Sequence, residues 1–138
     1  MSKWENNTYN EPIILGEGVN TKGAEYNAFI APDESYLIFG GWRRPNGLGS
    51  GDMYISENKN GEWSMAQDLG EKINSKGMEF CPFVNNGTLY FTSRRSSVEM
   101  KVNGFNSAEE LISQISKYDN GFSRIYQVEF KNYNSQSQ

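Results

Sequence analysis

The sequence predicts an all-β fold made of two similar antiparallel units, and three observations support this prediction. Aromatic residues are abundant, with eight Tyr, eight Phe and three Trp among 138 residues, and such residues favour pleated, half-buried strands. Most of the fourteen glycines lie between short apolar runs, as expected for turns that join strands. The most informative observation is an internal repeat, in which one stretch of sequence recurs 54 positions later.

The first copy of the repeat reads Gly16-Glu-Gly-Val-Asn-Thr-Lys-Gly-Ala-Glu-Tyr26, and the second reads Gly70-Glu-Lys-Ile-Asn-Ser-Lys-Gly-Met-Glu-Phe80. A further similarity follows each copy, between residues 31–39 and 85–91, where the offset is 52. A unit that recurs with a period of about 50 residues cannot bury its apolar face alone, so it stacks against its neighbours. Two units are too few to close a ring, so the repeat predicts self-association as well as a fold.

Each unit divides into short apolar runs separated by turn residues. In the first unit, Pro32-Asp-Glu-Ser35 predicts a chain reversal, and Asn58-Lys-Asn-Gly61 predicts a hairpin turn. The expected strands are residues 26–31, 36–40, 53–56 and 63–69 in the first unit and residues 80–84, 88–92 and 124–128 in the second.

The two units are incomplete at opposite ends. Residues 9–15 align with the fourth strand of the first unit, at the 54-residue offset, and so form an additional strand that precedes that unit. No fourth strand is expected in the second unit, where a polar tail at 132–138 follows. An unpaired edge strand is an aggregation template unless another strand covers it. We therefore expect residues 9–15 to complete the second unit of a neighbouring copy.

Four segments point to a known family: Ala31-Pro-Asp-Glu-Ser-Tyr-Leu-Ile-Phe39, Gly51-Asp-Met-Tyr-Ile-Ser56, Gly61-Glu-Trp-Ser64 and the stretch from Leu69 to Ser75. They resemble the TolB-like β-propeller repeat, a WD-repeat-like family whose motif is Pro-Asp-Gly followed by a strand. The resemblance covers about residues 9–93 and returns at 123–128, where Arg124 stands in the place of Asp52. It implies four-stranded blades around a channel, most often six blades, and six blades from two-blade chains make a trimer. Four or eight blades would need a dimer or a tetramer, and the alternative is that the chain is a fragment of a longer propeller.

With this resemblance, residues 1–138 are expected to form a single two-blade unit: an outer strand at 9–15, a first blade at 25–69 and a second blade at 79–130, with a helical insert at 96–122. Within the insert, Ser107-Ala-Glu-Glu110 is a capping box. Ala108, Leu111, Ile112 and Ile115 follow at the spacing of one apolar helix face. The pattern predicts a helix over 107–118 that covers the channel or packs against the next subunit, in preference to one that recognises a partner.

Seven residues are candidates for ligand binding on one face of the blades. The loops that lead into each first strand and those between the second and third strands emerge on the same side, because successive antiparallel strands reverse direction. The first loops contain Asn20 and Asn74. The seven candidates are Glu25 and Glu79, with which the first loops end, and Trp42, Arg43, Arg44, Arg94 and Arg95 of the second loops.

Each type of candidate has more than one interpretation. The glutamates, six near one rim of a trimer's channel, could accept hydrogen bonds from a neighbouring blade or bind a cation. The arginines could form blade-to-blade salt bridges with Glu25 and Glu79, or they could clamp an anionic ligand with their planar donors. Trp42 could be a stacking platform for a sugar or peptide, or it could pack over a loop.

Composition excludes several classes of function. The chain has no histidine, which removes Ser-His and Cys-His mechanisms, and we predict no catalytic residues, metal or cofactor. The single cysteine, Cys81, lies in an expected strand and is predicted to be a small buried apolar residue. A net charge of −4 without a long basic run argues against nucleic acid. No apolar stretch has the length of a membrane span or a signal peptide, which predicts a cytoplasmic location.

The sequence therefore favours a non-catalytic β-propeller module that is assembled by oligomerisation. Its partners would be further copies of itself and a small polar ligand or a peptide, bound on the loop face and the rim of the channel. Two alternatives remain open: a hydrolase-like propeller enzyme that uses glutamate and arginine, and a purely structural oligomer.

Overall fold

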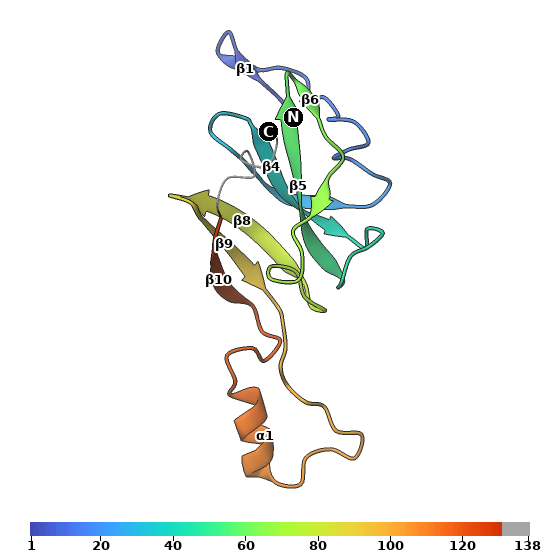
Figure 1. Ribbon diagram of the computed structural model, residues 1–138, viewed down its shortest axis with the longest axis vertical. Coiled ribbons are helices and arrows are strands. Elements are labelled where there is room, and N and C mark those ends of the chain that lie inside the picture. Colours follow the sequence, from blue (N-terminus) through green and yellow to red (C-terminus); the bar gives the residue numbers. More distant parts are fainter. Residues whose placement is uncertain (131–138) are drawn as a thin grey trace, which may run out of the picture.

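A computed structural model describes residues 1–130, and most of their regular structure is antiparallel β-sheet (Figure 1). An arm that carries the helix extends away from the sheets (Figure 1). The elements in chain order are β1 (Trp4–Glu5), β2 (Thr8–Tyr9), β3 (Glu25–Ile30), β4 (Tyr36–Trp42), β5 (Gly51–Lys59), β6 (Glu62–Trp63), β7 (Gln67–Asp68), β8 (Glu79–Asn85), β9 (Thr88–Ser93), α1 (Ala108–Ile115) and β10 (Arg124–Glu129).

The first sheet contains the strands expected for the first unit. Its order is β3-β4-β5, and β6 and β7 both pair with β5. The fourth strand, expected over 63–69, is interrupted between these two short strands. The reason is that Ala66 donates its N–H to the carbonyl of Gly18, at 2.9 Å, and so bonds to the loop before β3.

The second sheet has the order β10-β9-β8, as expected for the second unit. Strand β10 is at the edge of this sheet among the described residues. The polar tail at 132–138 lies outside those residues. Among residues 1–130, the second sheet is therefore a three-stranded counterpart of the first, with β10 as its last strand.

The two sheets pack face to face around one apolar core. Ile38, Met53 and Ile55 of the first sheet and Leu89 and Phe91 of the second are almost completely buried in it. Each such side chain contributes about 1.5–3 kcal/mol when it is removed from water. This packing is the main tertiary contact of the chain.

A loop contact beside the core aligns the two sheets. Ser50 donates its N–H to the carbonyl of Gly77 at 3.0 Å, and Gly51 forms a parallel bridge with Met78. A side chain at Gly49 would overlap the carbonyl oxygen of Gly77. The close approach of the two loops therefore requires glycine at position 49.

The N-terminal segment differs from the expected strand over 9–15. Strands β1 and β2 form a small hairpin, in which Asn6 and Asn7 have φ values of 51° and 61°. Such positive values suit the tight turn of a two-residue hairpin. Residues 10–15 follow with no assigned strand, and Ile14 is 81% exposed. This segment bonds instead to the start of the chain, where the N–H of Ile13 donates to the carbonyl of Met1 at 2.8 Å and that of Asn10 to the carbonyl of Lys3 at 2.9 Å.

The arm between β9 and β10 contains the predicted helix. Ser107 caps its first turn, because its hydroxyl accepts the N–H of Glu110 at 3.2 Å. The helix ends at Ile115, earlier than the expected residue 118, where Asn120 Nδ2 donates to the carbonyl of Ile115 at 2.7 Å. No residue of α1 is buried, so the helix neither covers nor packs on a sheet of its own chain. Within residues 1–130, no helix is long and apolar enough to cross a membrane.

Both sheets contain a β-bulge at the same position of their first strand. The register shifts between Tyr26 and Phe29 in β3 and between Phe80 and Phe83 in β8. The bulges contain Asn27, with φ 47°, and Cys81, with φ 53°. The prediction that Cys81 is buried is wrong, since it is exposed. The bulge interrupts the alternation of faces on which that prediction depended.

The bulge gives a matched pair of test substitutions. Cys81→Asn should raise the free energy of unfolding by roughly 0.5–1 kcal/mol, because asparagine tolerates positive φ better than other non-glycine residues. Asn27→Cys should lower it by a similar amount. Urea denaturation of both variants measures the two effects, and effects of the same sign would contradict this explanation.

Candidate functional site

Glu79 fastens the loop before β8 to the second sheet. Its side chain is fully buried and accepts three hydrogen bonds: from the N–H of Ser75 at 2.9 Å, from the hydroxyl of Ser75 at 2.6 Å and from that of Ser93 at 2.6 Å. The N–H of Gly77 in turn donates to the hydroxyl of Ser75 at 3.0 Å. The carboxylate thus satisfies the donors of a tight loop in a place that water does not reach.

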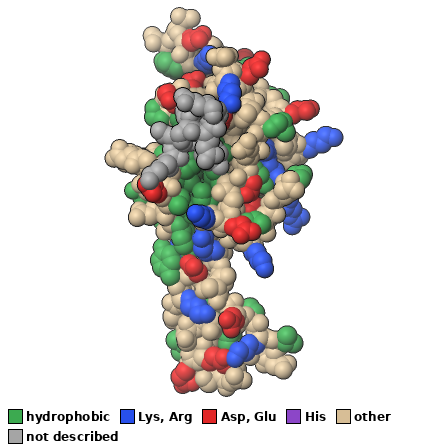
Figure 2. Space-filling model, in the orientation of Figure 1, with side chains coloured by type: hydrophobic (Ala, Val, Ile, Leu, Met, Phe, Trp, Pro, Cys, Tyr) green, Lys and Arg blue, Asp and Glu red, His purple; other side chains and the backbone are tan. Residues whose placement is uncertain are grey.

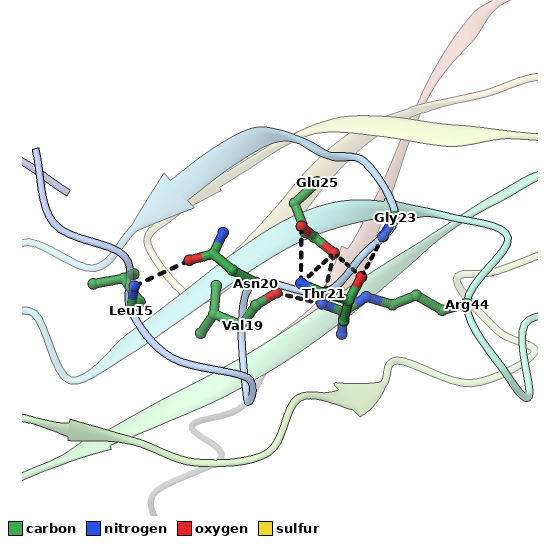
Figure 3. A network of polar contacts seen from close by, with 7 residues as sticks. All are labelled: Leu15, Val19, Asn20, Thr21, Gly23, Glu25 and Arg44. Atoms are coloured by element: carbon green, nitrogen blue, oxygen red, sulfur yellow. Dashed lines mark hydrogen bonds and ion pairs between the residues drawn. The ribbon is translucent and has the colours of Figure 1, made fainter.

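Glu25 makes the same arrangement in the first sheet (Figure 3). It accepts the N–H of Thr21 at 3.3 Å and its hydroxyl at 2.7 Å, and Gly23 donates to that hydroxyl at 3.0 Å. Burial alone would raise the pKa of Glu25, but hydrogen bonds from Thr21 and Arg44 outweigh it and lower the pKa. Each glutamate therefore binds its own loop, where the sequence suggested a neighbouring blade or a cation.

Arg44 and Arg95 hold equivalent positions after the second strand of each sheet. Arg95 donates to the carbonyl of Ile73 at 2.7 Å, and its guanidinium lies 4.4 Å from the ring centre of Tyr126. Arg44 donates to the carbonyl of Val19, which is the repeat equivalent of Ile73. A cation over an aromatic ring contributes about 0.5–2 kcal/mol. Both arginines therefore bind the loop that precedes the first strand of their own sheet.

The two arginines differ in their second partner. Arg44 forms an ion pair with Glu25 at 3.0 Å, within one sheet, whereas one of the two interpretations of the sequence placed such a pair between blades. Arg95 Nε donates instead to the hydroxyl of Ser93 at 3.1 Å. Gly41 stands at the equivalent position of the first sheet, and the buried Nε of Arg44 has no partner among the described residues. The difference between serine and glycine thus accounts for the unpaired atom.

Trp42, Arg43 and Arg94 remain on the surface. Trp42 is 39% exposed, and the guanidinium of Arg43 lies 5.4 Å from its ring centre. Arg94 is exposed, lies 5.6 Å over Phe80 and donates to Ser123 at 3.2 Å. Of the seven predicted site residues, these three are the ones whose side chains are left accessible to a ligand.

Sequence reasoning did not identify Asp52 as a key acidic residue. It is fully buried and accepts the N–H groups of Leu48 at 3.2 Å and Gly49 at 3.2–3.3 Å. Burial raises the pKa of Asp52, although these hydrogen bonds act in the opposite direction. The signal in the sequence that could have identified Asp52 is its place in Gly51-Asp-Met-Tyr-Ile-Ser56, one of the four segments that resemble the propeller repeat. Asp52 holds the loop between β4 and β5 against the sheet.

A pocket of about 390 Å³ lies on the face of the first sheet opposite the shared core. It has apolar walls and a polar end formed by Asn20 and Glu25. The apolar lining includes Leu15, Val19, Leu37 and Phe39. Among residues 1–130, no group of three or more acidic, cysteine or histidine side chains could hold a metal ion. The pocket therefore resembles an interface for apolar side chains more than a metal site.

No protein-family model, curated protein or solved structure matches the chain.

The role of the buried glutamate can be tested by truncation. Glu79→Ala should lower the free energy of unfolding by roughly 2–5 kcal/mol, because it leaves one N–H and two hydroxyls unpaired inside the protein. Glu25→Ala should cost less, since its loop is partly exposed. Urea denaturation gives both values, and a Glu79→Ala chain as stable as the wild type would contradict the assigned role.

Asp52 predicts a pH effect of definite sign. Because its pKa is raised on folding, the folded state binds this proton more tightly, and ionised Asp52 reduces stability above the folded pKa. Asp52→Asn removes this cost and can still accept both N–H groups. The stability of the variant relative to the wild type should therefore be greatest at pH 7 and fall as the pH is lowered through the folded pKa. Denaturant titrations from pH 7 to 4 measure this change; a constant difference would contradict it.

Proposed function

We propose that the chain is a non-catalytic two-blade segment of a β-propeller, which associates head to tail with further copies to complete the ring. Six blades, and therefore a trimer, is the assembly that we favour. The first blade is the sheet of β3–β7, and the second is the sheet of β8–β10. The observation that carries the proposal is that the second blade exposes the face whose equivalent in the first blade is buried in the shared core.

The second blade exposes the face that corresponds to the core-facing side of the first blade. In the first blade, Ile38, Met53 and Ile55 face the core between the sheets. Their repeat equivalents in the second blade are Tyr90, Ile125 and Gln127, and Ile125 is 70% exposed. Phe83 is also exposed, and hydrophobic side chains gather over β8–β10 on the face shown in Figure 2.

On the first blade, the residues that would form the other half of the contact are buried in a second cluster with Val19 and Tyr54, beside a pocket. Leu89 and Phe91 of the second blade are buried in the shared core, and their equivalents in the first blade are Leu37 and Phe39. These two residues line the pocket of about 390 Å³. A contact between unlike faces repeats from copy to copy until a ring closes.

The strand edges support the same arrangement. Strand β7 pairs Gln67 and Asp68 with Ile55 and Tyr54 of β5. At the 54-residue offset, the equivalents of this strand are Ile13 and Ile14, which are exposed and belong to no strand. Residues 9–15 would thus supply the fourth strand beside β10 of a neighbouring copy, and Leu15 would follow it.

A small polar ligand or a peptide would bind to the candidate residues that do not hold the sheets and loops together. Glu25, Glu79, Arg44 and Arg95 are bonded within their own sheets. Trp42, Arg43 and Arg94 are accessible and combine an aromatic face with cationic donors. The internal bonding of the first four also favours the alternative of a purely structural oligomer, which differs only in lacking this ligand.

The assembly can be tested by measuring mass in solution. Light scattering after size exclusion should give about three times the chain mass of 15.7 kDa. Deletion of residues 1–14 should yield a folded monomer, because the exchanged strand is lost. A monodisperse wild-type monomer would contradict the proposal.

A matched pair of charge substitutions locates the contact. Ile125→Asp should prevent assembly, because it places a carboxylate in an apolar interface. Met65→Asp should leave the mass unchanged, since Met65 is 71% exposed on the outer side of the already completed first blade. Equal behaviour of the two variants would place the interface elsewhere.

A further inference from the structure

We propose that the side chain of Asn20 binds the main chain of Ile125 in a second copy of the protein and thereby fixes the register of their contact. This inference rests on the proposed head-to-tail assembly and identifies a residue that determines its geometry. We call the pair of Asn20 and Ile125 the intersubunit clasp.

The chain already contains one such clasp between its own sheets. Asn74 Oδ1 accepts the N–H of Met53 at 2.8 Å, and Asn74 Nδ2 donates to the carbonyl of Met53 at 2.9 Å. Leu69 donates its N–H to the same carbonyl at 3.1 Å. Asn74 is 2% exposed. One buried amide therefore satisfies both main-chain groups of a strand residue and holds the two sheets together.

The main chain at Asn20 has the same local geometry as that at Asn74, although the bond from Asn74 Nδ2 to Asp68 at 2.8 Å has no counterpart, since Ile14 stands in the place of Asp68. The N–H of Asn20 donates to the carbonyl of Gly16 at 2.8 Å, and the N–H of Asn74 donates to that of Gly70 at 2.8 Å. Both turns begin with a glycine of positive φ, 89° at Gly16 and 78° at Gly70. The first loop therefore holds Asn20 in the same way as the second loop holds Asn74, on the side where a preceding blade would lie.

Ile125 is the residue of the second sheet that corresponds to Met53. Met53 pairs with Gly40 across β4 and β5, and Ile125 pairs with Thr92 across β9 and β10. Gly40 and Thr92 are related by the 52-residue offset. The main-chain N–H and carbonyl of Ile125 therefore have the orientation of those of Met53, away from β9 and toward the side of β10 that pairs with no strand of residues 1–130.

In the single chain, the groups that would make this contact bond to each other. Leu15 donates its N–H to Asn20 Oδ1 at 3.0 Å (Figure 3). Leu15 and Asn20 are the equivalents of Leu69 and Asn74, which both bind Met53. The two residues also lie together on the wall of the 390 Å³ pocket. A strand that entered this pocket could separate them and satisfy both.

The carbonyl of Ile125 has a temporary partner in its own chain. It accepts the hydroxyl of Tyr118, at the base of the arm, at 2.9 Å. Docking would exchange this bond for those from Leu15 and Asn20 of the second copy. Tyr118 therefore competes with the clasp, and its removal should favour association.

The clasp predicts opposite effects for two substitutions on the dissociation constant of the assembly, measured by sedimentation equilibrium. Asn20→Ala should raise it roughly 10- to 100-fold, because the main chain of Ile125 loses its partner. Asn20→Asp, which keeps the acceptor and removes the donor, should also raise it. Tyr118→Phe should lower it several-fold and keeps the ring that packs on Tyr126. Asn74→Ala is the matched control and should lower the stability of the chain itself.

Cysteine pairs test the register independently, in a Cys81→Ser background. Ile13→Cys combined with Gln127→Cys copies the pairing of Gln67 with Ile55. Oxidation should link these residues between copies on a non-reducing gel, since paired strand residues have the spacing of a disulfide. Ile14→Cys combined with Gln127→Cys is displaced by one residue and should not cross-link.

The outcomes separate the clasp from the assembly. A wild-type chain that stays monomeric at all concentrations overturns both. Assembly and in-register cross-linking, together with an unchanged dissociation constant for folded Asn20→Ala and Asn20→Asp, overturn the clasp alone. Weaker association of the Asn20 variants with tighter association of Tyr118→Phe supports the clasp.

Discussion

The face-to-face contact between the two sheets is the constraint on which the rest of the molecule depends. Three strands of the second sheet cannot bury their apolar residues without Ile38, Met53 and Ile55 of the first. The buried amide of Asn74 adds direction to this contact, since it bonds to both main-chain groups of Met53. Apolar area gives stability, and the amide restricts the sheets to one register, because a shifted strand would leave it unpaired.

The strands could be predicted because the repeat, the turn residues and the apolar runs agree on them. The helix followed from Ser107 and the spacing of its apolar residues. The interruption of the fourth strand could not be predicted, because it results from a bond between Ala66 and a loop distant in sequence. The exposure of Cys81 was missed for a related reason: a bulge changes the face of a residue without changing the hydrophobic pattern.

For the candidate site, the sequence predicted the positions of the charged residues but not their bonding partners. The repeat placed the arginines on the loops and the glutamates at the start of the first strands, but their partners depend on distances of a few ångströms. Ser93 satisfies both Glu79 and Arg95, whereas Gly41 leaves Arg44 to pair with Glu25. Because of these local bonds, most of the charged candidate side chains hold loops in place. Of the seven candidate residues, Trp42, Arg43 and Arg94 are the ones with exposed side chains.

The arm at 96–122 occurs in the second repeat alone, although the two sheets are otherwise alike. In the proposed ring, its helix would project beside every other blade. The backbone would then have nearly sixfold symmetry, while the surface around the loops would have threefold symmetry, with three arms separated by three open positions. A partner that recognised the arms would meet sites related by one third of a turn, so its own symmetry would decide whether one, two or three of them were occupied.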